Sequence, residues 1–157
     1  MLRVYLETSF VSACVTTKED EASRDQRWRS LAWWHRHRDD VSAWGSSEVM
    51  RELLAEDYRD RLAALRFVAG LPIVSPDAEV GRIADALRAE RLVPRGDLGD
   101  ALHAALAIRH RMDRLLSWDA RHLAHPGKRR GLERVCRRLG YPAPWFLTPV
   151  AWEGRGG

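Results

Sequence analysis

Short apolar segments alternate with amphipathic helical segments along most of this sequence, and this alternation restricts the fold more than any other feature. β-branched and aromatic residues predict strands at 3–6, 41–44, 71–74, 114–118 and 146–148. Apolar residues at helical spacing predict helices between them, at 9–15, 27–38, 46–58, 60–68, through Val80 to Leu87, and at 97–112. Strands that alternate with helices form a mostly parallel sheet covered on both faces, so the sequence predicts an α/β fold.

The length of 157 residues is that of one domain, which we place at residues 1–152, with residues 153–157 as a flexible C-terminal tail. Apolar residues make up 45% and charged residues 31%, which is ordinary for a globular protein with a buried core. Neither a P-loop nor a GxGxxG motif follows any predicted strand, and this argues against the nucleotide-binding versions of an α/β fold.

The sequence predicts a cytoplasmic protein without membrane association. It has no apolar stretch long enough to cross a bilayer, and its N-terminus lacks the regions of a signal peptide. Cys14 and Cys136 are its two cysteines, and they lie far apart without a CxxC motif. This pattern fits a reducing compartment better than a disulfide framework.

A basic segment near the C-terminal end begins at Lys128, Arg129 and Arg130 and continues through Arg138. The net charge of +4 permits nucleic-acid binding without requiring it. Two interpretations of the segment remain open. It is either the solvated face of a helix or a surface that contacts the phosphates of a nucleic acid.

Carboxylates gather where strands end and helices begin, which is the edge where open α/β sheets bind ligands. Each acid also has an ordinary role as a helix cap, a partner of the helix dipole or half of an ion pair. Like charges brought together repel unless a proton or a cation resolves them, and oxygen ligands suit Mg²⁺ or Mn²⁺. The acids at this edge are Glu7, Glu48, Glu52, Asp97, Asp100 and Asp119.

Two rival kinds of site have weaker support. The HxH at residues 35–37 and the HxxH at 122–125 belong to no HExxH helix and have no cysteine cluster beside them, which disfavours zinc. A Ser or Cys hydrolase is disfavoured because Cys14 has no evident base and no GxSxG occurs. His103 fits a packed or supporting histidine better than a ligand.

Four stretches resemble successive motifs of PIN domains, in the right order and over nearly the whole chain. They are YLETSFVSA at 5–13, SSEVMREL at 46–53, GDALHAALA at 99–107 and LLSWDARHLAHP at 115–126. The resemblance is greatest to the bacterial VapC-like branch, whose members act as toxins in toxin–antitoxin pairs. It implies a three-layer α/β/α fold with an acidic pocket that binds one or two divalent metal ions.

The resemblance also assigns roles to particular residues. Glu7, Glu52, Asp100 and Asp119 take the places of the catalytic, metal-binding acids. Supporting roles fall to the hydroxyl residues Thr8 and Ser9, to Glu48 as an alternative one turn before Glu52, and to Asp97, which has no firm counterpart. The basic residues Lys128, Arg129 and Arg130 become a candidate surface for the RNA backbone.

Glu7 departs from the family pattern, in which the first acid is usually aspartate. Glutamate has one more methylene, so its carboxylate reaches further and has more rotamer freedom. Glutamate is an equally good oxygen ligand, so the departure by itself does not predict inactivity.

The resulting expectation is a Mg²⁺- or Mn²⁺-dependent endoribonuclease, the toxin of a type II pair, with RNA as substrate, a small antitoxin as partner and a homodimer as its assembly. The alternative is a module that kept the fold for binding nucleic acid or protein and lost efficient metal binding, and the atypical Glu7 motivates it. A DNA or flap nuclease is disfavoured because the chain is short for the clamping elements of such enzymes.

Overall fold

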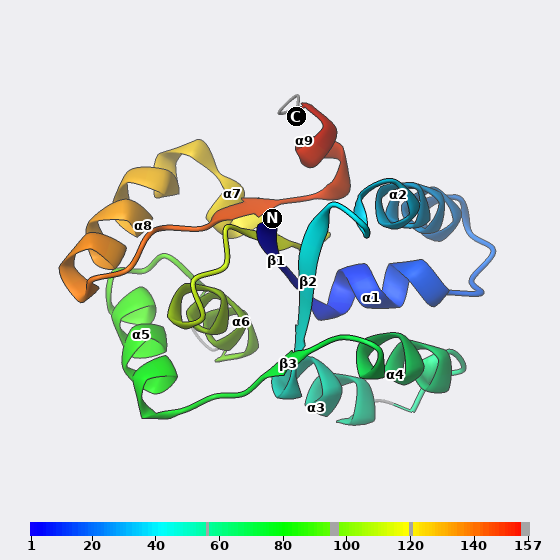
Figure 1. The fold of residues 1–157 in the computed structure, drawn as a ribbon, viewed down its shortest axis with the longest axis horizontal. Coiled ribbons are helices and arrows are strands. Elements are labelled where there is room, and N and C mark those ends of the chain that lie inside the picture. Colours follow the sequence, from blue (N-terminus) through cyan, green and yellow to red (C-terminus); the bar gives the residue numbers. More distant parts are fainter. Residues whose placement is uncertain (56, 95–97, 120, 155–157) are drawn as a thin grey trace.

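The computed structural model describes residues 1–55, 57–94, 98–119 and 121–154, and its centre is a parallel sheet (Figure 1). The strand order is β3-β2-β1-β4-β5, and every pairing is parallel. The first strand in the sequence is therefore the middle strand of the sheet. The strands are β1 (Leu2–Leu6), β2 (Val41–Ser46), β3 (Ile73–Val74), β4 (Arg114–Leu116) and β5 (Trp145–Leu147).

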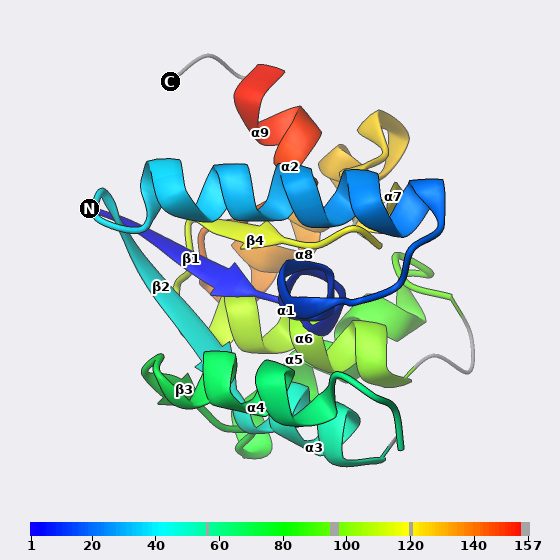
Figure 2. The ribbon, with the colours of Figure 1, turned by 90° about the vertical axis from the view of Figure 1, so that its right-hand side faces the viewer.

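Helices cover both faces of the sheet, which confirms the three-layer α/β/α prediction (Figures 1 and 2). On one side lie α1 (Thr8–Val15), α2 (Glu21–His37) and α4 (Arg61–Ala69). On the other lie α5 (Ala78–Ala89), α6 (Leu98–Arg109) and α8 (Pro126–Leu139). The remaining helices are α3 (Ser47–Ala55), α7 (Arg121–Ala124) and α9 (Pro149–Gly154).

The core lies between these layers. Tyr5 and Leu6 of β1 are fully buried, because a middle strand with helices on both faces exposes neither side. Trp33 of α2 is 1% exposed and packs edge-to-face against Phe10 of α1 and Trp152 of α9. This aromatic contact attaches the C-terminal helix to the layer formed by α1 and α2.

Several boundaries differ from those predicted. α2 begins at Glu21 rather than at residue 27, because the Asp20 side chain accepts a hydrogen bond from the Ser23 amide and caps the helix. The helix predicted to end at residue 58 ends at Ala55. At the C-terminus, residues 153 and 154 belong to α9, and the Glu153 carboxylate contacts His37. Residues 155–157 lie outside the described residues.

No helix in the described part of the chain combines the length and the apolar character needed to cross a membrane.

Candidate active site

Glu7 follows the middle strand directly and caps the next helix. Its backbone is extended, and its side-chain Oε2 accepts a hydrogen bond from the Ser9 amide at 2.9 Å. The same oxygen accepts bonds from the Ser9 hydroxyl at 2.5 Å and the Ser117 hydroxyl at 2.8 Å. Glu7 is 8% exposed, so these donors compensate for the water that its carboxylate loses on burial. Oε1 is left to face the centre of the site.

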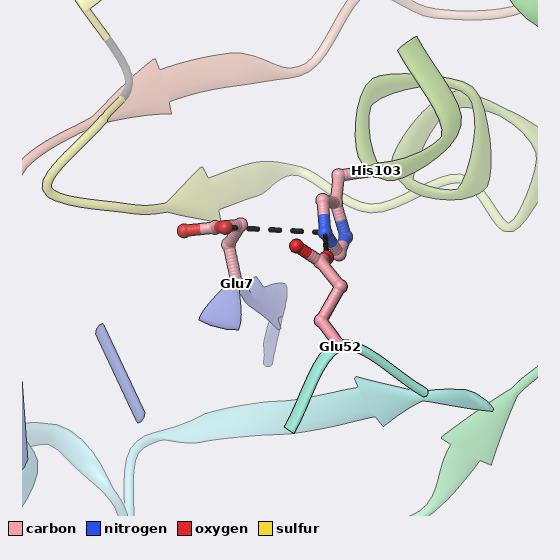
Figure 3. A group of neighbouring side chains, drawn as sticks. All are labelled: Glu7, Glu52 and His103. Atoms are coloured by element: carbon pink, nitrogen blue, oxygen red, sulfur yellow. Dashed lines mark hydrogen bonds and ion pairs between the residues drawn. The ribbon is translucent and has the colours of Figure 1, made fainter. Parts of the chain in front are cut away.

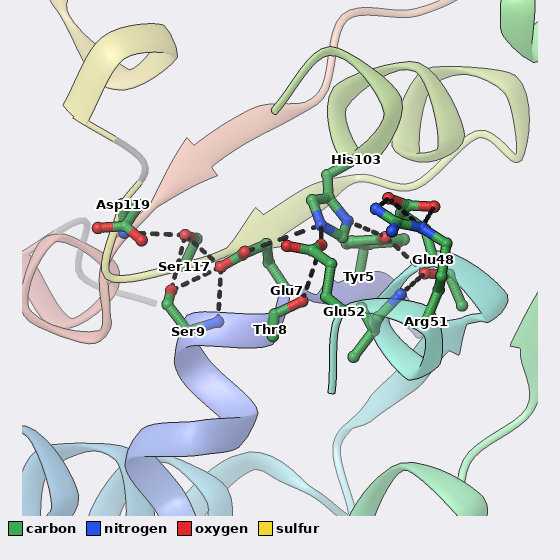
Figure 4. A network of polar contacts seen from close by, with 12 residues as sticks. Tyr5, Glu7, Thr8, Ser9, Glu48, Arg51, Glu52, His103, Ser117 and Asp119 are labelled. Atoms are coloured by element: carbon green, nitrogen blue, oxygen red, sulfur yellow. Dashed lines mark hydrogen bonds and ion pairs between the residues drawn. The ribbon is translucent and has the colours of Figure 1, made fainter. Parts of the chain in front are cut away.

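Two serines join the ends of β1 and β4 around this carboxylate (Figure 4). Ser9 Oγ accepts a hydrogen bond from the Trp118 amide, and Ser117 Oγ accepts one from the Asp119 amide. The turn that carries Asp119 is therefore tied to the turn that carries Glu7. This linkage fixes the two strand-end acids relative to each other.

Glu52 approaches from the second turn of α3. Thr8 Oγ1 donates a hydrogen bond to its Oε1 at 3.2 Å, and His103 Nε2 contacts the same oxygen. Burial favours a raised pKa for this carboxyl, but the hydrogen bond and charge of His103, the bond from Thr8 and the charge of Arg51 outweigh it. The pKa of Glu52 is consequently lowered, and its carboxylate is ionised at neutral pH.

His103 of α6 completes the centre of the site (Figure 3). Its Nε2 lies 3.9 Å from Glu7 Oε1, in addition to its contact with Glu52. Burial lowers the pKa of this imidazole, but the hydrogen bond to Glu52 and the charges of Glu7 and Glu52 raise it further, so the net shift is upward. The imidazole thus offsets part of the negative charge gathered here.

The other ring nitrogen of His103 faces the core. Its Nδ1 lies 2.5 Å from the Tyr5 hydroxyl, which lies 2.7 Å from Ser46 Oγ. Ser46 Oγ in turn accepts a hydrogen bond from the Val49 amide in the first turn of α3. The chain of contacts starts at Glu52 on α3 and returns to the N-terminus of the same helix.

Asp100 and Asp119 lie in the lining of the cleft that also contains Glu7 and His103. All four residues line one hollow that opens to solvent. Asp119 also borders the adjoining cleft, which contains Thr8, Ser9 and Glu52. The residues predicted as metal ligands therefore line two clefts that share Asp119. Within the described residues, however, the side chains whose ligand atoms lie within 4.8 Å of one another are Glu7, Glu52 and His103.

The family model of the PIN domain matches residues 4–128. The chain belongs to the PIN domain family. Its fold is also similar to that of a chain in the crystal structure of VapBC2 from Rickettsia felis bound to a DNA fragment from their promoter, with a TM-score of 0.60. That likeness covers 94% of this chain and 98% of the other, at 15% sequence identity. No curated protein sequence matches this chain.

One acid considered from the sequence of this PIN domain, Glu48, has its charge paired away from the centre of the site. Glu48 is 4% exposed and forms an ion pair with Arg51 at 2.6 Å, so its charge is already balanced. Asp97 lies outside the described residues. Because Glu48 is paired with Arg51 while Glu52 contacts His103, Glu52 is the better candidate of the two for a metal ligand.

The basic segment of this PIN domain divides into residues with different surroundings. Arg129 donates to the carbonyls of Pro144 and Ala143 and stacks over the Trp145 ring at 3.7 Å, which makes it part of the scaffold. Lys128 borders a hollow that also contains Arg91. Arg130 is exposed on α8, whose buried face is formed by Leu132, Val135 and Cys136.

His103 is buried and contacts Glu52, in agreement with the packed or supporting histidine expected from the sequence, whereas the contact of Tyr5 with His103 was not expected. His103 comes three residues after Asp100 in the PIN motif GDALH, and residues three apart share a helix face. Tyr5 comes two residues before Glu7, and side chains two apart lie on the same side of a strand. Both spacings were readable in the sequence, but the burial that brings the two residues into contact was not.

Proposed function

We propose that this PIN domain is a divalent-metal-dependent endoribonuclease that hydrolyses RNA phosphodiester bonds and acts as the toxin of a type II toxin–antitoxin pair. The observation that carries the proposal is the convergence of Glu7 and Glu52 at the carboxyl edge of the sheet, with Asp100 and Asp119 on the walls of the same clefts. Ligand sites of open α/β folds lie at this edge.

The donor set fits a divalent cation. Two carboxylates and an imidazole nitrogen approach within 4.8 Å of one another, although buried charges of one sign repel. Glu7 and Glu52 would hold Mg²⁺ or Mn²⁺, and Asp100 and Asp119 would reach it from the cleft walls. The bound ion supplies charge that lowers the pKa of an attacking water and stabilises the phosphate and the leaving oxygen.

The chain's own residues orient these groups. Ser9 and Ser117 hold one oxygen of Glu7 and leave the other toward the centre. Thr8 and His103 hold Glu52. Since five hydrogen bonds fix the two carboxylates before any substrate arrives, little reorganisation is needed at the time of reaction.

The positions of the sequence's two lysines support a path for a single RNA strand. Lys18 lines the cleft that contains Glu52, and Asp119 belongs both to this cleft and to the hollow lined by Glu7 and Asp100, here called the acidic hollow. On the other side, Val93 lines both the acidic hollow and the hollow that contains Lys128 and Arg91. A strand that crosses the acids would therefore find cationic groups for its phosphates on both sides, and hydroxyl groups of Thr8, Ser9, Ser12, Thr16 and Ser23 beside Lys18.

The proposed partners are a small antitoxin and a second copy of the chain, and the proposed compartment is the cytoplasm. The fold's likeness to a chain of VapBC2 supports the toxin–antitoxin assignment. Trp28, Leu54 and Leu62 are large apolar side chains that are more than half exposed, which supports a protein interface. Light scattering of the purified chain, alone and co-expressed with the product of a short neighbouring reading frame, tests both assemblies.

The central test is cleavage of RNA with Mg²⁺ or Mn²⁺ present and after its removal by chelation. We expect Asp100→Asn to lower cleavage by about 10²-fold or more, because the carboxylate charge at the cleft is lost while the side chain keeps its size. Asp85→Asn, on the exposed surface of α5, is the matched control. Undiminished cleavage by Asp100→Asn would exclude Asp100 from the site. Failure of the folded wild type to bind Mn²⁺ in calorimetry would favour the binding-module alternative.

A further inference from the structure

The imidazole of His103 lies beside the place where Glu7 and Glu52 could bind one ion together. The residue is 3% exposed and lies beneath the cleft, with Nε2 directed toward both carboxylates (Figure 3). Nε2 contacts Glu52 Oε1 and lies 3.9 Å from Glu7 Oε1. A cation held between these two oxygens would therefore lie beside Nε2.

The far side of the ring is held as it is in histidines that bind metals. Such histidines almost always make a hydrogen bond through their second nitrogen, which fixes the orientation and tautomer of the ring. Here Nδ1 contacts the Tyr5 hydroxyl, and the Tyr5 hydroxyl contacts Ser46 Oγ (Figure 4). In the metal-free protein Nε2 donates to Glu52, and the rest of the chain is satisfied when Nδ1 donates to Tyr5 and both Tyr5 and the Val49 amide donate to Ser46. A bound ion would take the place of the proton on Nε2, so that the ring keeps its bond to Tyr5 and presents the Nε2 lone pair to the ion.

We propose that His103 is a ligand of the metal ion through Nε2, and that this nitrogen makes the site select a first-row transition ion such as Mn²⁺ over Mg²⁺. The inference rests on the metal dependence proposed above and deepens it. Mg²⁺ takes oxygen ligands in near-ideal octahedra, whereas imidazole nitrogen suits transition ions. The ligand set expected from the sequence was all oxygen, and with His103 it contains one nitrogen.

The role of ligand differs from that of a positioning residue, and the chain offers a variant that separates them. His103→Gln removes the imidazole nitrogen but retains an amide that can donate a hydrogen bond to Glu52. If His103 only orients Glu52, the glutamine preserves much of this role, and any loss affects Mn²⁺ and Mg²⁺ equally. A ligand role predicts an unequal loss.

The experiment uses the full-length protein with Mn²⁺ alone, without RNA. Pulsed electron paramagnetic resonance of the Mn²⁺-loaded wild type is expected to show ¹⁴N hyperfine coupling from a directly bound imidazole, and His103→Gln is expected to lose it. In calorimetric titrations His103→Gln is expected to weaken Mn²⁺ binding by about tenfold or more while leaving Mg²⁺ binding nearly unchanged. His35→Gln, an exposed histidine on α2, is the control and should match the wild type.

The absence of ¹⁴N coupling in Mn²⁺-loaded wild type, or a parallel loss of Mn²⁺ and Mg²⁺ affinity in the variant, overturns the assignment. The coupling in the wild type decides the question even where His103→Gln does not fold. A folded wild type that binds no Mn²⁺ overturns both this inference and the metal dependence. If the coupling is present but RNA is not cleaved, the nuclease proposal fails and the ligand assignment stands.

Discussion

At the scale of single residues, Glu7 divides its two carboxylate oxygens between different tasks. Oε2 caps α1 and accepts bonds from the hydroxyls of Ser9 and Ser117, whereas Oε1 points toward His103. Glutamate at this position, in place of the usual aspartate, thus provides one carboxylate that both caps α1 and faces the centre of the site.

Replacing Glu7 with glutamine tests the charge of this residue separately from its length. Glu7→Gln keeps an acceptor for the α1 cap but removes one of the negative charges that repel each other in the metal-free site. We expect the metal-free variant to be at least as stable as the wild type in thermal denaturation, because functional sites retain unfavourable charge for the sake of activity.

In the same experiment Mn²⁺ is expected to raise the melting temperature of the wild type and to have little effect on Glu7→Gln, because a ligand stabilises only the state that binds it. Asp85→Asn again serves as the control. An equal upward shift in wild type and Glu7→Gln would show that the charge of Glu7 does not contribute to metal binding.

The two cysteines also yield a prediction at this scale. Burial raises the pKa of Cys14 to about 12 and that of Cys136 to about 11. Since the thiolate is the reactive form, both are expected to resist iodoacetamide at pH 8 and to become reactive as the pH approaches these values or on unfolding. Mass spectrometry of native and urea-unfolded protein measures the modification. Rapid labelling of the native chain at pH 8 would contradict the burial of these thiols.

At the scale of elements, two glycines of helical segments are expected to respond in opposite ways to replacement by alanine. Gly140 ends α8 in the left-handed region, with φ of 86°, where a side chain is disfavoured. Gly81 lies within α5, and a methyl group there would meet no atom within 4 Å. We expect Gly140→Ala to lower the free energy of unfolding by about 1 kcal/mol and Gly81→Ala to raise it by about 0.5–1 kcal/mol.

Urea denaturation of the two glycine variants beside the wild type measures both effects. Each variant serves as the control for the other, because both add one methyl group to a helical segment and only the backbone conformation differs. Changes of the same sign would mean that one of the two backbone conformations is not as described.

Patterns of apolar residues located most elements, and their failures have local causes. The five strands and the helix at α6 followed from runs of β-forming residues and from regular helical spacing. α8 was not delimited because its apolar residues, Leu132, Val135 and Cys136, are few among basic ones. The apolar pattern predicts the start of α2 too far along the chain, because the first turn after the Asp20 cap is polar. Helix caps and polar helix faces carry little signal in hydrophobic periodicity.

The positions of the candidate acids were predictable, and the approach of His103 to them was not. Strand ends and the family motifs predict Glu7, Glu52, Asp100 and Asp119 at one edge of the sheet, and in the structure these residues line two clefts that share Asp119. The close approach of His103 to two carboxylates depends on how α6 packs over β1 and α3, which no local pattern specifies. Burial and tertiary packing supply that information.

At the scale of the whole molecule, cationic groups on both sides of the acids predict how RNA binding responds to salt. In the Asp100→Asn background, which is expected to be deficient in cleavage, Lys18→Ala and Lys128→Ala are each expected to reduce the slope of log affinity against log salt by about 0.7, the value for one phosphate contact on a single strand. Fluorescence anisotropy of a labelled single-stranded RNA measures the slope.

Arg137→Ala, an exposed cation toward the far end of α8, provides the comparison and is expected to leave the slope unchanged. An unchanged slope in both lysine variants would place the RNA path elsewhere on the surface. A reduction for one lysine alone would limit the path to that side of the acids.

The strand order has a consequence for the timing of activity during synthesis. β1 emerges from the ribosome first but needs β2 on one edge and β4 on the other, and Glu7 needs Ser117 at the end of β4. A nascent or prematurely terminated chain that lacks β4 contains Glu7 and Glu52 without the strand that fixes them. Long-range pairing of this kind forms late, so nuclease activity would arise only after most of the chain has been translated. Under the proposed nuclease function, incomplete products would therefore be inactive.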